Sequence, residues 1–158
     1  MNRINKKISI PLSLFDDAIS WAEQAALIGL ENGITLNDDQ TQVAKQVGVI
    51  HHERIRLLQT DEFPFPRDAG LQKAAIEFGL LGPSTVGLTL GYTIFIRPSV
   101  FTSRILAHER RHVFQFECAG SLPAFLGEYL QQIVEHGYRN APMEIDARRW
   151  EENCESDT

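Results

Sequence analysis

Two histidines flanking a glutamate, in the run His108-Glu109-Arg110-Arg111-His112, are the residues of this chain whose types and spacing indicate a chemistry. On an α-helix, residues four apart lie one turn above each other on the same face, so both imidazoles can bind one transition-metal ion. Glu109 would then lie beside the metal, where a carboxylate can take a proton from a metal-bound water. The simpler alternative is a pair of core histidines on an ordinary helix, since roughly one such sequence in a hundred would contain the motif by chance.

The segment that carries the motif has the periodicity of an amphipathic helix over residues 103–120. Apolar side chains recur on the same side as the two imidazoles: Ile105, Val113 and Phe116. This spacing places His108, His112 and Glu109 towards the interior. By the same geometry we expect Arg110 and Arg111 to point away and face water.

A catalytic zinc site takes three protein ligands and keeps one position open for water, so the two imidazoles require a third ligand. The short extension that supplies a third histidine in metzincins is absent, because no Gly-x-x-His follows His112. The candidates further along the chain are His136, Glu128, Glu135, Glu144 and Asp146. The residue types by themselves leave this choice open.

Residues 106–150 resemble the core of zincin metallopeptidases of the gluzincin kind, in particular the small single-domain bacterial ones. The matching stretches are His108-Glu109-x-x-His112-Val113-x-Gln115, Gly127-Glu128-Tyr129-Leu130, and the run from Gly137 to Ala147 that contains Asn140-Ala141-Pro142-Met143-Glu144. The resemblance implies that Glu144 is the third metal ligand. Asp146 either orients a metal-binding imidazole without binding the metal itself, or it lies on a solvated helix face.

The interval between His112 and Glu144 is wider than is usual in that family, so a full helix must run out and back between the two ligands. Glu144 also lies in the first turn of an expected helix, where a carboxylate is favoured by the helix dipole whether or not a metal is bound. The alternative to metal binding is therefore that Glu144 stabilises the N-terminal end of this helix through the helix dipole.

Helical spacing and capping residues predict further helices on both sides of the motif, at residues 13–31, 37–48, 68–79, 121–137 and 143–150. Residues 55–60 are typical of a strand. Residues 85–97, rich in Thr, Val, Ile and aromatic residues, predict either one strand or a hairpin about Gly91. This segment directly precedes the motif helix, and two roles for it stay open: a sheet edge to which an extended peptide adds by backbone hydrogen bonds, or a core strand with no ligand role.

The predicted fold class is therefore α+β: a mostly helical, zincin-like single domain over residues 1–158, with a small sheet against the motif helix. We expect the ends, residues 1–12 and 151–158, to be frayed. A length of 158 residues is enough to bury a substantial core.

Composition and the order of residues at the N-terminus limit the kinds of binding partner and the cellular compartment that we expect for this protein. A net charge of -6 argues against a nucleic-acid binder that works by neutralising phosphates. The basic N-terminus is followed by Pro11, Asp16 and Asp17 instead of an unbroken apolar stretch, so we expect no membrane span and a cytoplasmic protein. The two cysteines, Cys118 and Cys154, do not make a disulfide framework, and we expect Cys118 to be a small buried residue and not a stray metal ligand.

The sequence thus predicts a zinc-dependent hydrolase, a metallopeptidase acting on a peptide or protein. His108, His112 and Glu144 would hold Zn²⁺, and Glu109 would be the general base. Tyr138, His136 and Tyr129 are open alternatives for stabilising the oxyanion. A catalytically silent zincin-like module, stabilised by metal and used for interactions, is the competing prediction. The sequence leaves the cleavage specificity and the oligomeric state open.

Overall fold

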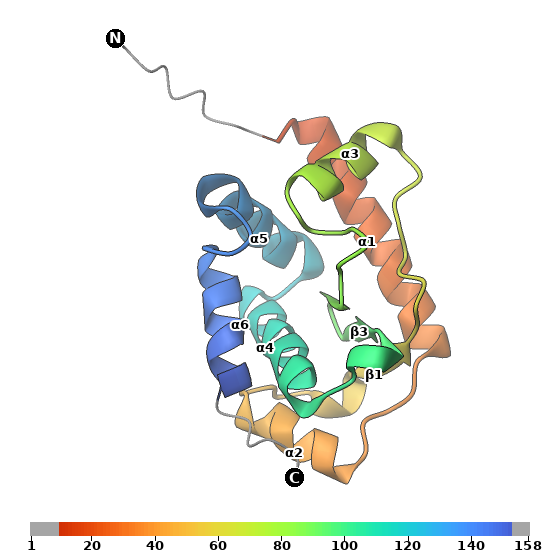
Figure 1. The fold of residues 1–158 in the computed structure, drawn as a ribbon, viewed down its shortest axis with the longest axis vertical. Coiled ribbons are helices and arrows are strands. Elements are labelled where there is room, and N and C mark those ends of the chain that lie inside the picture. Colours follow the sequence, from red (N-terminus) through yellow and green to blue (C-terminus); the bar gives the residue numbers. More distant parts are fainter. Residues whose placement is uncertain (1–9, 153–158) are drawn as a thin grey trace.

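The helix that carries the motif, α4 (Ser103–Ala119), lies at the centre of the fold in Figure 1, where the other elements surround it. The Thr102 hydroxyl caps its start by accepting a hydrogen bond from the Ile105 backbone N–H. Gly120, at φ 90°, ends it in a left-handed conformation that favours glycine. Both ends of α4 are therefore fixed by local sequence, close to the predicted limits of residues 103–120.

The computed structural model describes residues 10–152 as an α+β domain. The remaining elements, in chain order, are α1 (Leu12–Asn32), α2 (Asp38–Gln46), the 3-10 turn η1 (His52–Arg54), β1 (Arg56–Gln59), α3 (Ala69–Glu77), β2 (Gly87–Leu90), β3 (Thr93–Ile96), the 3-10 turn η2 (Pro98–Val100), α5 (Leu122–His136) and α6 (Pro142–Glu152).

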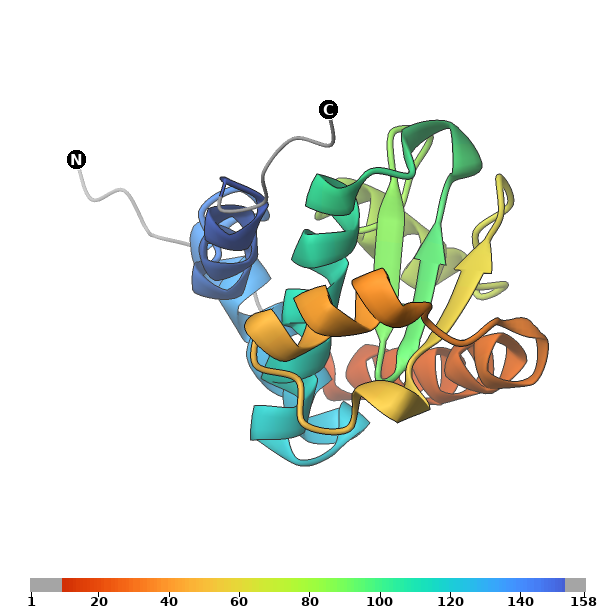
Figure 2. The same cartoon turned by 90° about the horizontal axis from the view of Figure 1, so that it is seen from below.

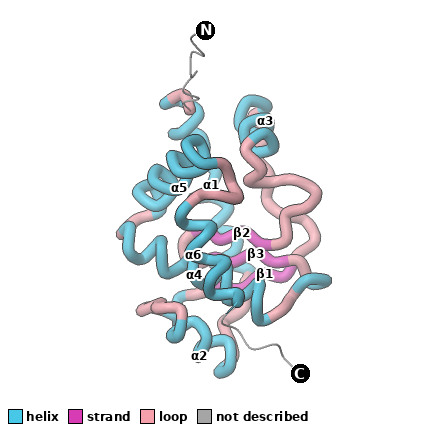
Figure 3. Tube along the Cα trace, turned by 60° about the vertical axis from the view of Figure 1, so that its left-hand side comes forward, coloured by secondary structure: helices cyan, strands magenta, loops and turns pink. Residues whose placement is uncertain are grey.

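The three strands form one sheet in the order β1-β3-β2 (Figure 3). β2 and β3 form an antiparallel hairpin, whose turn uses Gly91 at φ 63°. β1 pairs with β3 in parallel, which requires the long connection through α3. The hairpin alternative for residues 85–97 is therefore the correct one, and β2 lies at an edge of the sheet.

The two faces of the sheet bury two separate apolar clusters. On one face Leu57, Ile94 and Ile96 pack with residues of α2 and α4. On the other face Leu90 and Phe95 pack with residues of α1 and α5. Figure 2 shows α1 crossing beneath the strands while α4 stands beside them. The sheet is thus a layer between helices, and it rests against the motif helix as predicted.

The chain leaves α4, runs out along α5 and returns along α6, and α6 packs along α4. This is the excursion that the interval between His112 and Glu144 requires. Pro142, with no N–H to leave unpaired, starts α6, and the Met143 N–H donates to the Gln132 side chain of α5. The first turn of α6 is thereby held against α5 and beside α4.

The expectation that Arg110 and Arg111 face water is wrong. The side chain of Arg110 is 1% exposed, and it donates to the backbone carbonyls of Leu106 and Gln40. Arg111 donates to the Val47 carbonyl and pairs with Asp146. The reason is tertiary: α2 and α6 cover the side of α4 that helical spacing assigned to solvent.

Cys118, in the last turn of α4, is exposed, contrary to the prediction. Cys154 lies outside the described residues. Most of the ends predicted to be frayed also fall outside them, although Leu12 starts α1 and α6 includes Glu151 and Glu152. Within residues 10–152 there is no helix with the length and apolar character that crossing a membrane requires.

Candidate metal centre

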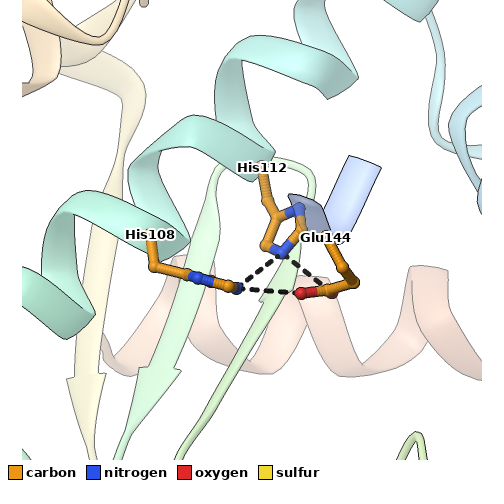
Figure 4. A group of neighbouring side chains, drawn as sticks. All are labelled: His108, His112 and Glu144. Atoms are coloured by element: carbon orange, nitrogen blue, oxygen red, sulfur yellow. Dashed lines mark hydrogen bonds and ion pairs between the residues drawn. The ribbon is translucent and has the colours of Figure 1, made fainter. Parts of the chain in front are cut away.

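The side chains of His108, His112 and Glu144 converge between α4 and α6 (Figure 4). The two imidazole Nε2 atoms are 3.2 Å apart. Each lies 3.1 Å from a different oxygen of the Glu144 carboxylate. All three residues are buried, with Glu144 only 1% exposed. The structure therefore brings together the two motif histidines and the glutamate that the resemblance implied.

The other nitrogen of each imidazole faces an acceptor. His112 Nδ1 is 2.8 Å from the side-chain oxygen of Gln115. The amide of Gln115 is oriented by its nitrogen, which donates to the Met143 carbonyl and to Asp146. His108 Nδ1 lies 2.6 Å from Glu151 Oε1, although the angle is not that of a straight hydrogen bond. The hydrogen-bond acceptor at His112 Nδ1 favours the tautomer of His112 with its proton there, which leaves the His112 Nε2 lone pair directed at His108 Nε2 and Glu144.

Three lone-pair donors that face one another in a buried space repel unless a cation or protons lie between them. Glu144 Oε2 has no hydrogen-bond partner although it is buried. Tetrahedral zinc, with Zn–N bonds of about 2.0–2.1 Å, separates neighbouring ligand atoms by about 3.3 Å, close to the separations here. The nitrogen and oxygen donors suit a borderline divalent metal. The residues present therefore fit a metal ion.

Protons can replace the cation, and the titration behaviour reflects this. Burial lowers the pKa of His112, but the hydrogen bond and charge of Glu144 outweigh burial and raise it to about 9. Burial opposes ionisation of Glu144 as well, yet the two imidazoles hold the pKa of that carboxyl well below its usual value. Proton and metal compete for the same nitrogens, so the same contacts that would bind a metal also bind protons tightly.

A chain of polar contacts extends behind His112. Asp146, in the second turn of α6, accepts from Gln115 at 3.0 Å and from Arg111 Nε at 2.7 Å. Burial raises the pKa of Asp146, but the hydrogen bonds from Arg111 and Gln115 lower it more, so the carboxylate stays ionised. Asp146 therefore orients Gln115, which contacts the imidazole; it does not contact the imidazole itself.

Two tyrosines lie on the α5 side of the site. The Tyr129 hydroxyl donates to Glu144 Oε1 at 2.7 Å, so it is committed to the carboxylate. Tyr138, just after α5, lines the same cavity as Glu144. Burial, together with the charges of Glu144 and Glu109, raises the pKa of Tyr138, which keeps its hydroxyl protonated. Tyr138 is also 41% exposed, so unlike Tyr129 it can be reached from solvent.

Glu109 is buried next to β2 and is not one of the three converging ligands. Its Oε2 accepts a hydrogen bond from the Thr89 hydroxyl at 2.6 Å. Gly87 lies two residues before Thr89 on β2, on the same face of the sheet. A Cβ added to Gly87 would lie 2.5 Å from Glu109 Oε1. The carboxylate therefore occupies the space that Gly87 leaves, and it lines the same cavity as His112 and Glu144.

The other candidates for a third ligand lie elsewhere. Glu128 and Glu135 are exposed on α5. His136 is exposed at the end of α5, where it pairs with Glu135. Sequence reasoning had assigned no role to Thr89, Gln115 or Glu151. Gln115 follows His112 by three residues on one helix face, which is a detectable signal, whereas the contacts of Thr89 and Glu151 depend on tertiary packing.

Comparisons of the chain with protein-family models, with curated proteins and with solved structures found no match. The assignment of a metal centre therefore rests on the geometry described above.

Proposed function

We propose that this chain is a zinc-dependent hydrolase of amide bonds, a metallopeptidase of the gluzincin kind. The observation that carries the proposal is the convergence of three buried donors within 3.1–3.2 Å, next to a glutamate that is not needed to hold the metal. A purely structural zinc usually has four protein ligands and requires no such base. His108, His112 and Glu144 would hold the ion.

Bound zinc would supply Lewis acidity, which lowers the pKa of a water towards about 7. Glu109, which lines the same cavity as His112 and Glu144, would accept a proton from the attacking water as the water oxygen bonds to the amide carbon. The same carboxyl can then donate the proton to the amide nitrogen, so that the C–N bond breaks and an amine and a carboxylate leave. Tyr138 would donate a hydrogen bond to the carbonyl oxygen as negative charge develops there.

A peptide substrate is supported by the position of β2. One side of β2 pairs with β3, and no strand of the described part of the chain pairs with its other side. Gly87 and Thr89 of this strand face Glu109. An extended peptide that adds to the free edge by backbone hydrogen bonds would run past the site.

The test is to purify the protein, measure bound metal by mass spectrometry and assay cleavage of a mixed peptide library. Glu109→Gln removes the base without changing the size of the side chain. We expect it to reduce turnover at least about a thousandfold, in line with the loss of a general base and its proton delivery, while zinc stays bound. Glu128→Gln is the matched control, because this α5 carboxylate is exposed.

Two outcomes would contradict the proposal. An active preparation that loses nothing on the Glu109→Gln change would exclude this mechanism. A protein that binds zinc and cleaves no member of the library would instead be the catalytically silent module.

A further inference from the structure

A large cavity opens beside the candidate metal centre and extends among α1, α3, α5 and β2. The space in it that the centres of water-sized molecules can occupy is about 130 Å³. Six of the residues that line it are charged or carry an imidazole or hydroxyl, and they are the residues of the site itself: Thr89, Glu109, His112, Tyr129, Tyr138 and Glu144. The polar groups of the cavity are therefore gathered where the proposed chemistry takes place.

The rest of the wall is apolar and comes largely from the N-terminal half of the chain. Large side chains include Leu14 and Trp21 of α1, Leu71 of α3, Phe78, Leu88 of β2 and Phe125 of α5. Protein interiors are close-packed and rarely leave voids larger than a water molecule, whereas this space can hold several such molecules. A space of this size that is continuous with a reactive centre has the character of a binding pocket.

Small residues on two helices keep the cavity open. Ala18 and Ala22 of α1 and Ala74 and Ala75 of α3 all line it, and the two helices contact each other. A larger apolar residue at any of these positions would fill part of the space. The width of the cavity is thus set by alanines, and it can be reduced without introducing charge.

We propose that this cavity binds an apolar arm of the substrate, so that the amide bond at the metal centre belongs to a molecule with a long aliphatic or aromatic group on one side. Such a group can be a fatty acyl chain or the side chain of an apolar amino acid, which share the same chemistry. The assignment of the reacting bond rests on the proposed function, but binding of the apolar arm does not.

The first test uses the zinc-loaded full chain and alkyl hydroxamates of increasing length, from acetyl through hexanoyl to decanoyl. The hydroxamate group chelates the metal while the alkyl chain enters the cavity. Trp21 lines the cavity and reports binding by fluorescence, in a Trp150→Phe background that leaves it as the only tryptophan. We expect affinity to rise about fourfold per methylene, the factor that corresponds to burial of each group. Affinity that does not change with chain length would overturn the proposal.

A second measurement separates this proposal from the proposed function. Metal-free protein should still bind octanol and decanol, with affinity that rises with chain length in the same way. The proposed metal ligands lie at one end of the cavity, and the apolar walls do not depend on them. If that dependence persists while the protein neither binds zinc nor cleaves an amide, the hydrolase fails and the binding pocket stands. If zinc binds and amides are cleaved without any dependence on length, the pocket fails and the hydrolase stands.

Variants on α3 locate the ligand. Ala74→Leu adds volume to the wall and should weaken decanoyl hydroxamate at least tenfold while acetyl hydroxamate binds as before. Ile76→Leu is the matched control, since Ile76 is 58% exposed on the same helix and does not line the cavity. Equal effects of both substitutions would contradict the location. A final comparison measures turnover of a decanoyl-glycine amide and of a peptide rich in Phe and Leu. The faster substrate shows whether the apolar arm is a fatty acyl chain or an apolar side chain.

Discussion

At the scale of single residues, the site depends on side chains that are not among its three converging donors. Gln115 holds His112 with its proton on Nδ1 and is itself oriented by Asp146 and Met143. A neutral imidazole is a metal ligand only through the nitrogen that lacks the proton, so this contact decides whether Nε2 can bind. The contacts run in order from the partly buried Arg111 through Asp146 and Gln115 to the buried His112.

Replacing Gln115 by leucine should therefore weaken zinc binding by about 10–100-fold, the usual effect of losing a partner behind a metal-binding histidine. Competition with a chelator of known affinity measures this directly. Gln131→Leu is the control, because Gln131 is exposed on α5 and its side chain donates to Glu135, away from the site. Unchanged zinc affinity in the Gln115 variant would show that the imidazole does not need this acceptor.

Gly87 determines where the carboxylate of Glu109 can lie. In Gly87→Ala the new Cβ would overlap Glu109 Oε1, at 2.5 Å, and the carboxylate must move away from β2. A displacement of about 1 Å in a catalytic group can reduce turnover about 100-fold. We expect this loss in kcat without loss of zinc, measured by peptide assay and metal analysis. In Gly82→Ala the added Cβ meets nothing within 4 Å, so activity should be unchanged.

At the scale of elements, α1 must approach the sheet closely enough to form one wall of the cavity. Gly29 permits this, because a Cβ there would lie 1.9 Å from Thr93 Cγ2 of β3. Thr93 in turn donates to the Ala26 carbonyl of α1 at 2.8 Å. This contact fixes α1 across the strands at the end away from α3.

Gly29→Ala should lower the free energy of unfolding by about 1–3 kcal/mol, the range for overpacking a core. This holds even though alanine is intrinsically the better helix former by about 1 kcal/mol. Gly127→Ala in α5 has room, with Phe15 Cζ at 3.4 Å, and should be neutral or stabilising. Urea unfolding of both variants makes the comparison, and equal changes would contradict the close-contact argument.

Much at this scale could be predicted from sequence because it depends on local signals. Apolar spacing predicted α4 over residues 103–120, and the structure adds local caps at Thr102 and Gly120 that agree with those limits. Gly91 was a possible hairpin turn, and the structure confirms the hairpin. The burial of Arg110 could not be predicted. Helical periodicity separates the polar side of α4 from its apolar side, but it does not show that α2 packs against the polar side. Glu144 was recognised through a resemblance, whereas Glu151 was assigned to a frayed end and its contact with His108 was missed.

At the scale of the whole molecule, zinc should stabilise the fold because its ligands come from two helices. Ligand present at 100 times its dissociation constant adds about 2.7 kcal/mol to the free energy of unfolding. For a domain of this size that corresponds to a rise in Tm of roughly 5–10 °C. Thermal unfolding with added zinc and with a chelator measures the difference, and coinciding transitions would contradict a shared metal centre.

The effect of pH on stability should have opposite signs with and without metal. In metal-free protein the pKa of His112 rises from 6.5 unfolded to about 9 folded. Its stabilising contribution is therefore complete below about pH 6.5 and is lost as the pH rises through 9. Glu144, whose pKa is lowered, contributes above its usual value of 4.5 and loses this as the pH falls. With zinc, protons compete with the ion, so the added stability should instead grow from pH 6.5 towards 9.

Thermal unfolding across this interval, in chelator and in zinc, distinguishes the two states of the site. Curves that run parallel would show that protons and metal do not share the same nitrogens.

Helix α6 holds His108 from both sides, with Glu144 near one ring nitrogen and Glu151 near the other. These two acids are two helical turns apart, so a single rigid rod presents both at a fixed spacing. If the backbone were nicked in the short connection between α5 and α6, a bound ion would add a link between the two pieces to the Arg111–Asp146 pair that already joins α4 and α6. Such a split protein would reassemble in proportion to free zinc, which would make it a genetically encodable sensor.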